Sequence, residues 1–167
     1  MAVSALFGGR DIRPMHDQLR RFAGQFGVTM HLADHLPNTR RALALAEVAR
    51  DQGRLDALRD AAMDAHWRDG RDIEDTAVLA DLAASAGLTA DAITAMDSPP
   101  MVARVAAMGR EAQRWGVTGI PTYFLLPDGW EPGVEATKDS PRPVKIVGCQ
   151  PYETVLAGCM RAGIARR

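Results

Sequence analysis

The sequence predicts an α+β fold that is predominantly helical, with both strands in the C-terminal third. Apolar residues recur at helical spacing, between capping residues and glycines, from residue 11 to residue 115. Two short runs rich in β-branched and aromatic residues follow at 122–126 (TYFLL) and 144–147 (VKIV), and a helical stretch closes the chain at about 151–164. A block of helices followed by strands indicates a helical lobe next to a small sheet.

The composition is that of a globular protein and argues against several classes. Of the 167 residues, 47% are hydrophobic and 25% charged, and the net charge of −1 gives no reason to expect a nucleic-acid partner. No run approaches the roughly 20 apolar residues of a membrane helix. The first ten residues, MAVSALFGGR, do not have the pattern of a signal peptide. With only two cysteines, the sequence predicts a cytoplasmic protein without membrane contact.

Residues 1–10 show no periodicity and are predicted to be a loose N-terminus, whereas residues 11–115 form the predicted helical lobe. Glycines end several of its helices, and Ser98-Pro99 is a strong signal for a helix start. Helices are predicted at about 11–26, 39–52, 55–67, from 72 or 75 to 86, at 89–97 and at 99–115. Residues expected on the core faces of the first three are Leu19, Phe22, Ala23 and Phe26, then Leu43 and Ala46, then Leu55, Leu58, Ala62, Ala65 and Trp67.

Residues 116–167 make up the predicted second part, with the two strands and the closing helix. The connection between the strands, 127–143, contains four prolines and exceeds the usual hairpin length of about 2–5 residues. The sequence therefore predicts an exposed excursion between the strands.

The segment 111–123, EAQRWGVTGIPTY, holds the most informative motif. A helix ends, a turn flanked by glycines follows, and Pro121 stands directly before a strand. Because proline lacks an N–H, a proline at the start of an edge strand is expected in any sheet. A functional interpretation stands beside this ordinary one, namely a cis Ile120–Pro121 bond at a contact site. Cis bonds are only about 5–6% of X-Pro bonds, so the surroundings must hold such a bond in place.

Three blocks of the sequence resemble, in order, the DsbA family of thioredoxin-like oxidoreductases. They are LPNTRRALALAEVARDQG (36–53), HWRDGRDIEDTAVLADLAASAGL (66–88) and RWGVTGIPTYFL (114–125), closed by VGCQPYETVL (147–156). The chain is similar in particular to the cytoplasmic FrnE-like branch, which neighbours the glutathione-dependent 2-hydroxychromene-2-carboxylate isomerases. The resemblance implies a DsbA-type helical lobe followed by the C-terminal half of a thioredoxin-like domain.

The resemblance also implies a substrate site. In the family a cis proline precedes this strand, next to the redox cysteines, and the backbone beside it pairs with an extended substrate chain. The residues carried over as substrate-binding are Gly119, Ile120 and Pro121. The expected ligand is a thiol or disulfide, in a peptide or in a small molecule.

The catalytic pair of the family, usually Cys-Pro-x-Cys, has no counterpart in this sequence. In the family it lies on a helix before the lobe, together with two strands that are also unmatched, so the sequence is predicted to be N-terminally truncated. Cys149 and Cys159 are ten residues apart and cannot easily replace the pair. Cys159 is expected to be a small buried residue, and Cys149 either another such residue or a reactive thiol. No catalytic residue is assigned, and the chain alone is predicted to be redox-inactive.

Three functions are compatible with these residues. The first is a DsbA-family protein without disulfide-exchange activity of its own. The second is a non-catalytic module in which an extended peptide, a second copy of the chain or another partner covers the open hairpin edge, because a two-stranded sheet is marginal alone. The third is a relative of the glutathione-linked isomerases or transferases, with glutathione as its ligand. No other cofactor is expected.

A metal site is not predicted. His31 and His35 are four residues apart, but their segment is a loop with no third ligand at hand. Asp72, Glu74 and Asp75 are interpreted as helix-capping residues rather than as acid–base catalysts.

Overall fold

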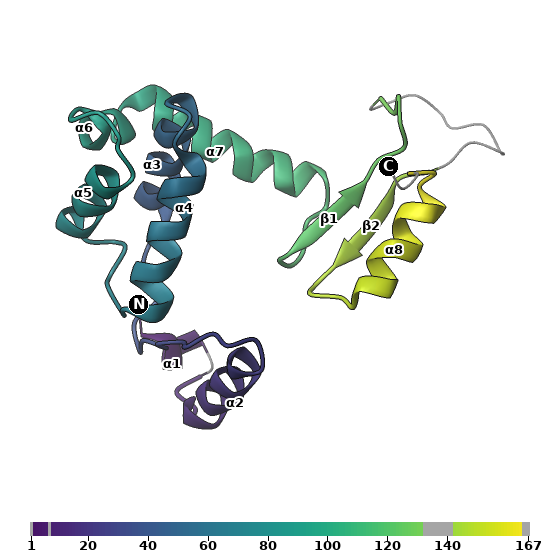
Figure 1. The fold of residues 1–167 in the computed structure, drawn as a ribbon, viewed down its shortest axis with the longest axis horizontal. Coiled ribbons are helices and arrows are strands. Elements are labelled where there is room, and N and C mark those ends of the chain that lie inside the picture. The colour runs from purple at the N-terminus through teal and green to yellow at the C-terminus, as the bar shows by residue number, and fades with distance from the viewer. Residues whose placement is uncertain (1, 7, 132–141, 165–167) are drawn as a thin grey trace. The chain divides into compact units, whose positions relative to one another are not determined.

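The computed structural model describes residues 2–6, 8–131 and 142–164. The chain divides into two compact units, residues 1–108 and 109–167 (Figure 1). The division falls inside helix α7 (Pro99–Arg114), whereas the sequence places the boundary after residue 115. The fold is α+β and predominantly helical, as predicted.

Among the described residues of the first unit, the regular structure is helical apart from one isolated backbone bridge. Helix α5 begins where the sequence predicts, because the side chain of Asp75 accepts a hydrogen bond from the Ala77 N–H at 2.7 Å and caps the first turn. The elements before α7 are α1 (Val3–Leu6), α2 (Arg13–Gly24), α3 (Arg40–Asp51), α4 (Leu55–Met63), the π-helical turn η1 (Asp64–Arg68), α5 (Thr76–Ser85) and α6 (Ala92–Met96).

The core of the first unit lies among α3, α4, α5 and α6, which pack against one another (Figure 1). Its most deeply buried large side chains are Leu45, Leu79 and Met96. Met101 and Val105, from the start of α7, pack on the same cluster. Alanines fill much of the remaining core, which allows the helices to approach closely.

The core face predicted for 55–67 agrees with the structure at Leu58 and Ala65 but not at Trp67, which is 39% exposed, and the face predicted for α3 differs as well. Leu58 and Ala65 are buried, as predicted, whereas Leu43 is 52% exposed. The buried stripe of α3 instead runs through Leu45 and Val48. Positions two apart on a helix are about 200° apart around its axis, so a stripe through Leu45 turns Leu43 outward.

Helix α2 also differs from the prediction. His16 and Ala23 are buried, but Leu19, Phe22 and Phe26 are 41%, 55% and 69% exposed. The rings of Phe22 and Phe26 contact each other edge to face, with 5.3 Å between their centroids. Three of the four residues expected to face the core are therefore exposed, and Ala23 is the one that is buried as predicted.

The first ten residues contain structure that the sequence does not indicate. Besides helix α1, the Val3 N–H donates to the Asp34 carbonyl at 2.7 Å, and Ala2 pairs with His35 as an isolated bridge. These bonds join the described N-terminal residues to the connection between α2 and α3. Such pairing between distant segments leaves no periodic signal in the sequence.

The helix predicted at 55–67 changes character at Asp64. From there to Arg68 the backbone is π-helical, and the Asp69 N–H donates to the Asp64 carbonyl, five residues back, at 3.0 Å. Gly70 follows with a φ of +67°, a conformation that glycine adopts without strain. A Cβ at Gly70 would lie 2.6 Å from the imidazole ring of His31, so this ring packs directly on the glycine.

The second unit consists of a hairpin and one covering helix. Strands β1 (Thr122–Leu125) and β2 (Val144–Val147) pair antiparallel, and helix α8 (Tyr152–Arg161) lies against one face of the sheet (Figure 1). The close approach occurs at Gly158, where a Cβ would lie 2.8 Å from Ile146 Cδ1. The other face carries Phe124, whose ring lies 4.8 Å from that of Trp115. Much of the predicted excursion between the strands, residues 132–141, lies outside the described residues.

Candidate functional site

The chain passes from α7 into β1 through a short loop at residues 115–121. Gly116 has a φ of +64°, and the Val117 N–H donates to the Ala112 carbonyl at 3.0 Å, which ends the helix. The ammonium group of Lys145, on β2, donates to the Gly116 carbonyl. The loop is therefore fixed to the sheet at its first residues.

The three residues predicted to bind substrate form the tip of this loop. The bond between Ile120 and Pro121 is cis. The side chain of Thr122 donates to the Gly119 carbonyl at 2.6 Å, and the Gly148 N–H donates to the Pro121 carbonyl at 2.8 Å. Ile120 is 90% exposed. Its large apolar side chain is therefore accessible, while hydrogen bonds fix the backbone at both neighbouring residues. Its role in substrate binding stays a prediction.

The register of the hairpin leaves the outer edge of β1 open. Because the Gly148 N–H donates to the Pro121 carbonyl, these two residues form a hydrogen-bonded pair. In an antiparallel ladder such pairs alternate with non-bonded pairs, whose N–H and C=O groups point away from the partner strand. Thr122, opposite Val147, and Phe124 therefore direct their backbone groups to the outer edge. The described sheet has two strands, so no third strand covers these groups.

The opposite edge of the hairpin is partly covered. The side-chain amide of Gln150 donates to the carbonyl of Val147 at 3.0 Å. Val147 belongs to a non-bonded pair, so its carbonyl points away from β1 and is free to accept this bond at the outer edge of β2. The more accessible edge is thus the one next to Ile120 and Pro121.

An aromatic cluster supports the loop from the helix side. Trp115 packs on Phe124 and, at 5.5 Å between centroids, on Trp130. Its indole N–H donates to a carboxylate oxygen of Glu111 at 2.7 Å. This bond, followed by the one from Arg114, lowers the pKa of Glu111 below its ordinary value. The indole is therefore anchored by an ionised carboxylate one helical turn back.

The two cysteines occupy different environments. Cys149 is exposed and directly follows Gly148, the residue bonded to Pro121. Cys159 is half-buried in α8, and both are free thiols. The backbone bond between Gly148 and Pro121 could not be predicted from the sequence, because it joins residues far apart in the chain. The sequence signal at this position is the block VGCQPYETVL (147–156), which resembles the family and contains Gly148 and Cys149.

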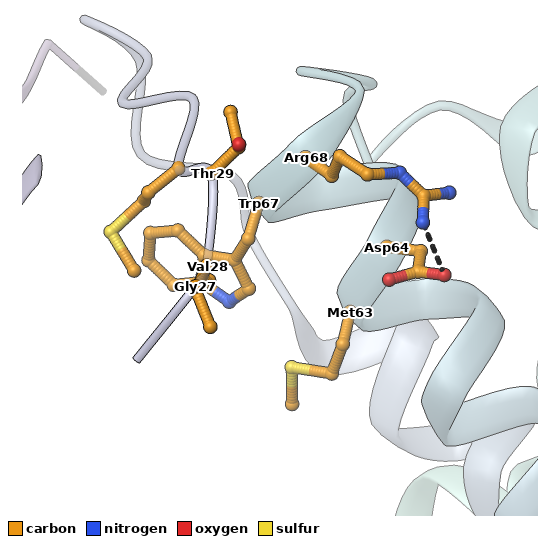
Figure 2. A pocket seen from close by; sticks show the side chains of 8 residues that line it. Gly27, Val28, Thr29, Met63, Asp64, Trp67 and Arg68 are labelled. Carbon is orange, nitrogen blue, oxygen red and sulfur yellow. Dashed lines mark hydrogen bonds and ion pairs between the residues drawn. The ribbon is translucent and has the colours of Figure 1, made fainter. Parts of the chain in front are cut away.

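A separate hollow of about 410 Å³ lies within the first unit (Figure 2). Its lining is mainly apolar and comes from the segment after α2 and from the end of α4 with η1. Asp64 and Arg68 form an ion pair of 2.9 Å at this site. The lining residues are Gly27, Val28, Thr29, Met30, Met63, Asp64, Trp67 and Arg68.

The two histidines considered together in the sequence have different surroundings. His31 packs on Gly70, whereas His35 lies next to the carboxylates of Asp72 and Glu74. The two carboxyl groups next to His35 thus come from a distant segment of the chain. Asp75 acts as a helix cap, as predicted.

Comparison with known proteins identifies the family. A family model described as a DSBA-like thioredoxin domain matches residues 8–157. The chain belongs to the DSBA-like thioredoxin domain family. This DsbA-like chain is also similar to a solved structure, that of a probable DsbA oxidoreductase from Streptomyces coelicolor, with 26% sequence identity and a TM-score of 0.74. The match covers 99% of this chain and 67% of that one. No curated protein matches.

The family expected from the sequence blocks is thus confirmed, together with the fold class. The FrnE-like branch, the N-terminal truncation and the cytoplasmic location of this DsbA-like chain stay predictions. Among its described residues, no helix combines the length and the apolar character needed to cross a bilayer.

Proposed function

We propose that this chain is a DsbA-type thioredoxin-like domain that binds extended polypeptide along β1, and that it does not catalyse disulfide exchange by itself. The observation that carries the proposal is the open edge of β1 next to the loop tip. Thr122 and Phe124 offer outward backbone donors and acceptors, and Ile120 offers an exposed apolar side chain beside them. An extended chain adding to a sheet edge uses both kinds of contact.

The proposed lack of activity rests on the cysteine content of these 167 residues. Disulfide exchange by a dithiol needs an attacking thiolate and a second thiol close enough to resolve the mixed disulfide. The two cysteines are separated by nine residues, without a Cys-x-x-Cys arrangement, and one of them is half-buried. This placement argues against redox turnover by the two thiols.

Peptide binding can be measured with reduced, carboxymethylated insulin B chain carrying a fluorescein label. Fluorescence anisotropy should rise with wild-type protein, and Ile120→Glu should weaken binding at least about tenfold, because a carboxylate would have to be desolvated at the contact. Val102→Glu is the matched control, since Val102 is also exposed, at 55%. Equal binding by both variants, or none by the wild type, would contradict the proposed edge.

Redox inactivity can be measured in a dithiothreitol-driven insulin reduction assay. Addition of the chain should leave the rate of turbidity at that of dithiothreitol alone, and Cys149→Ser should not change it. A faster rate that disappears in Cys149→Ser would show instead that Cys149 is a working thiol. Saturable binding of glutathione in a calorimetric titration, without binding of the insulin chain, would favour the isomerase-like alternative.

A further inference from the structure

Three side chains that could ligate a metal meet on the surface of the first unit. His35 belongs to the connection between α2 and α3, and Asp72 and Glu74 belong to the connection before α5. One ligand atom from each lies within 4.8 Å of the other two. The Nε2 atom of His35 is 3.3 Å from a carboxylate oxygen of Glu74, although the two residues are 39 positions apart in the sequence.

Backbone hydrogen bonds fix both carboxylates. The Asn38 N–H donates to Oε2 of Glu74 at 2.9 Å, and the Glu74 N–H donates to Oδ1 of Asp72, also at 2.9 Å. The bond from Asn38, followed by that from His35, lowers the pKa of Glu74 below its ordinary value. Each carboxylate has a second oxygen that these two bonds do not use.

We propose that His35, Asp72 and Glu74 bind a divalent transition-metal ion of the zinc type. Zinc takes imidazole nitrogen and carboxylate oxygen at about 2.0–2.2 Å, so two ligand atoms on one tetrahedral ion lie about 3.3–3.6 Å apart. The 3.3 Å between His35 Nε2 and the Glu74 oxygen already has this spacing, and side-chain rotation would bring Asp72, now within 4.8 Å of both, to the same distance. Mg²⁺ and Ca²⁺ fit less well because they prefer oxygen ligands alone. All three side chains are exposed, so water completes the coordination.

The bound ion would join two connections of the first unit. One contains His35 and Asn38, and the other ends at Asp75, the cap of α5. Because such an ion binds the folded chain in preference to the unfolded one, it would raise the midpoint of thermal unfolding in a concentration-dependent way. This role does not involve the cis-proline loop and is independent of the proposed peptide binding.

Isothermal titration of the full chain with zinc chloride tests the site. One equivalent should bind, and His35→Gln and Glu74→Gln should each weaken binding at least about tenfold, as expected for the loss of a ligand. Circular dichroism of each variant shows that it is folded. The matched controls are His66→Gln and Glu153→Gln, which remove an imidazole and a carboxylate elsewhere and should bind zinc as the wild type does.

The exposed thiol of Cys149 is the main competing ligand for zinc. Cys149→Ser should retain the full affinity, and cobalt chloride added to the wild type should give the weak visible absorption of nitrogen and oxygen ligands rather than an intense thiolate band. Loss of zinc binding in Cys149→Ser, unchanged binding in His35→Gln, or no binding by the wild type would each overturn the proposal.

Discussion

The absence of a Cβ at Gly70 leaves room for the imidazole ring of His31. The imidazole packs on the glycine so closely that a Cβ would approach three of its ring atoms to between 2.6 and 2.9 Å. The backbone there has a positive φ, so a side chain would also strain the turn that follows η1. The steric contact and the backbone strain would both arise at residue 70. Replacing His31 removes the steric contact and leaves the backbone strain, so the two effects can be separated.

Gly70→Ala should lower the free energy of unfolding by about 2 kcal/mol, of which about 1 kcal/mol is the cost of the left-handed backbone. In a His31→Ala background the same substitution should cost only that backbone share, because the ring no longer obstructs the Cβ. Urea unfolding of the four proteins in this cycle gives both numbers. An equal cost in the two backgrounds would show that the ring simply moves aside.

The bidentate ion pair of Arg41 and Asp97 contributes to the free energy of unfolding in a pH-dependent way. Arg41 donates to the two carboxylate oxygens at 2.9 and 2.7 Å and so lowers the pKa of Asp97, mainly through the hydrogen bond. A carboxyl group whose pKa is lowered on folding stabilises the protein above its ordinary pKa of 3.8 and loses this effect as the pH falls through the folded value. Both side chains are partly exposed, so the contribution at neutral pH is only about 0.2–1 kcal/mol.

Asp97→Asn should therefore unfold at a lower temperature than the wild type at pH 7, and the two midpoints should converge as the pH falls below about 4. Thermal unfolding followed by circular dichroism across this range measures the effect. Asp91→Asn, an exposed carboxylate without such a partner among the described residues, should show no comparable change. A constant difference at all pH values would assign the effect to something other than ionisation.

At the scale of elements, Gly158 sets the distance between α8 and the sheet. A Cβ at this position would lie 2.8 Å from Ile146 Cδ1 and 2.9 Å from Leu125 Cδ1. Both contacts are the ends of flexible side chains, so a methyl group can be accommodated by small rotations. A larger side chain has no such space between helix and strands.

Gly158→Ala should change the stability little, because the tighter packing offsets a gain in helix propensity of about 1 kcal/mol. Gly158→Leu should destabilise by about 1–3 kcal/mol through overpacking. Gly109→Leu is the matched control, since a Cβ at this helical glycine meets nothing within 4 Å. Chemical unfolding measures all three, and equal effects of the two leucine substitutions would contradict the packing argument.

Elements defined by local signals could be predicted from the sequence, and contacts between distant segments could not. The cap at Asp75, the start at Pro99 and the strand 144–147 agree with the structure because neighbouring residues encode them. The π-helical turn could not be predicted, because the apolar residues in this stretch have the spacing expected of an α-helix. In the candidate site, the loop tip was predicted from its motif, but the bond from Gly148 to Pro121 and the meeting of His35 with Glu74 depend on tertiary folding.

For the whole molecule, the open edge of β1 also permits pairing with a second copy of the chain. Such an edge is a template for another strand, and extended peptide and self-pairing would compete for it. The chain has a mass of 18.0 kDa, so light scattering distinguishes one copy from two. We expect self-pairing because it would use the same outward backbone groups of β1 as the proposed peptide binding.

The mass should rise toward that of two chains with increasing concentration and fall again when the insulin B chain is added. Thr122→Pro removes an outward N–H without breaking the ladder to β2, and it should keep the protein monomeric. Thr122→Val retains this N–H and should associate as the wild type does. A single-chain mass at every concentration, with peptide binding intact, would exclude self-pairing while leaving the proposed peptide site in place.

The π-helical turn η1 has a consequence for comparing this chain with its relatives. A π turn closes over five residues where an α-helix closes over four, so it contains one residue more than a regular helix of the same length. In evolutionary terms, such a turn is a single inserted residue that a helix has absorbed. Relatives without the insertion should show a one-residue gap between positions 63 and 69, and in those relatives the residues aligned with Trp67 and Arg68 should be rotated around the helix, away from the hollow.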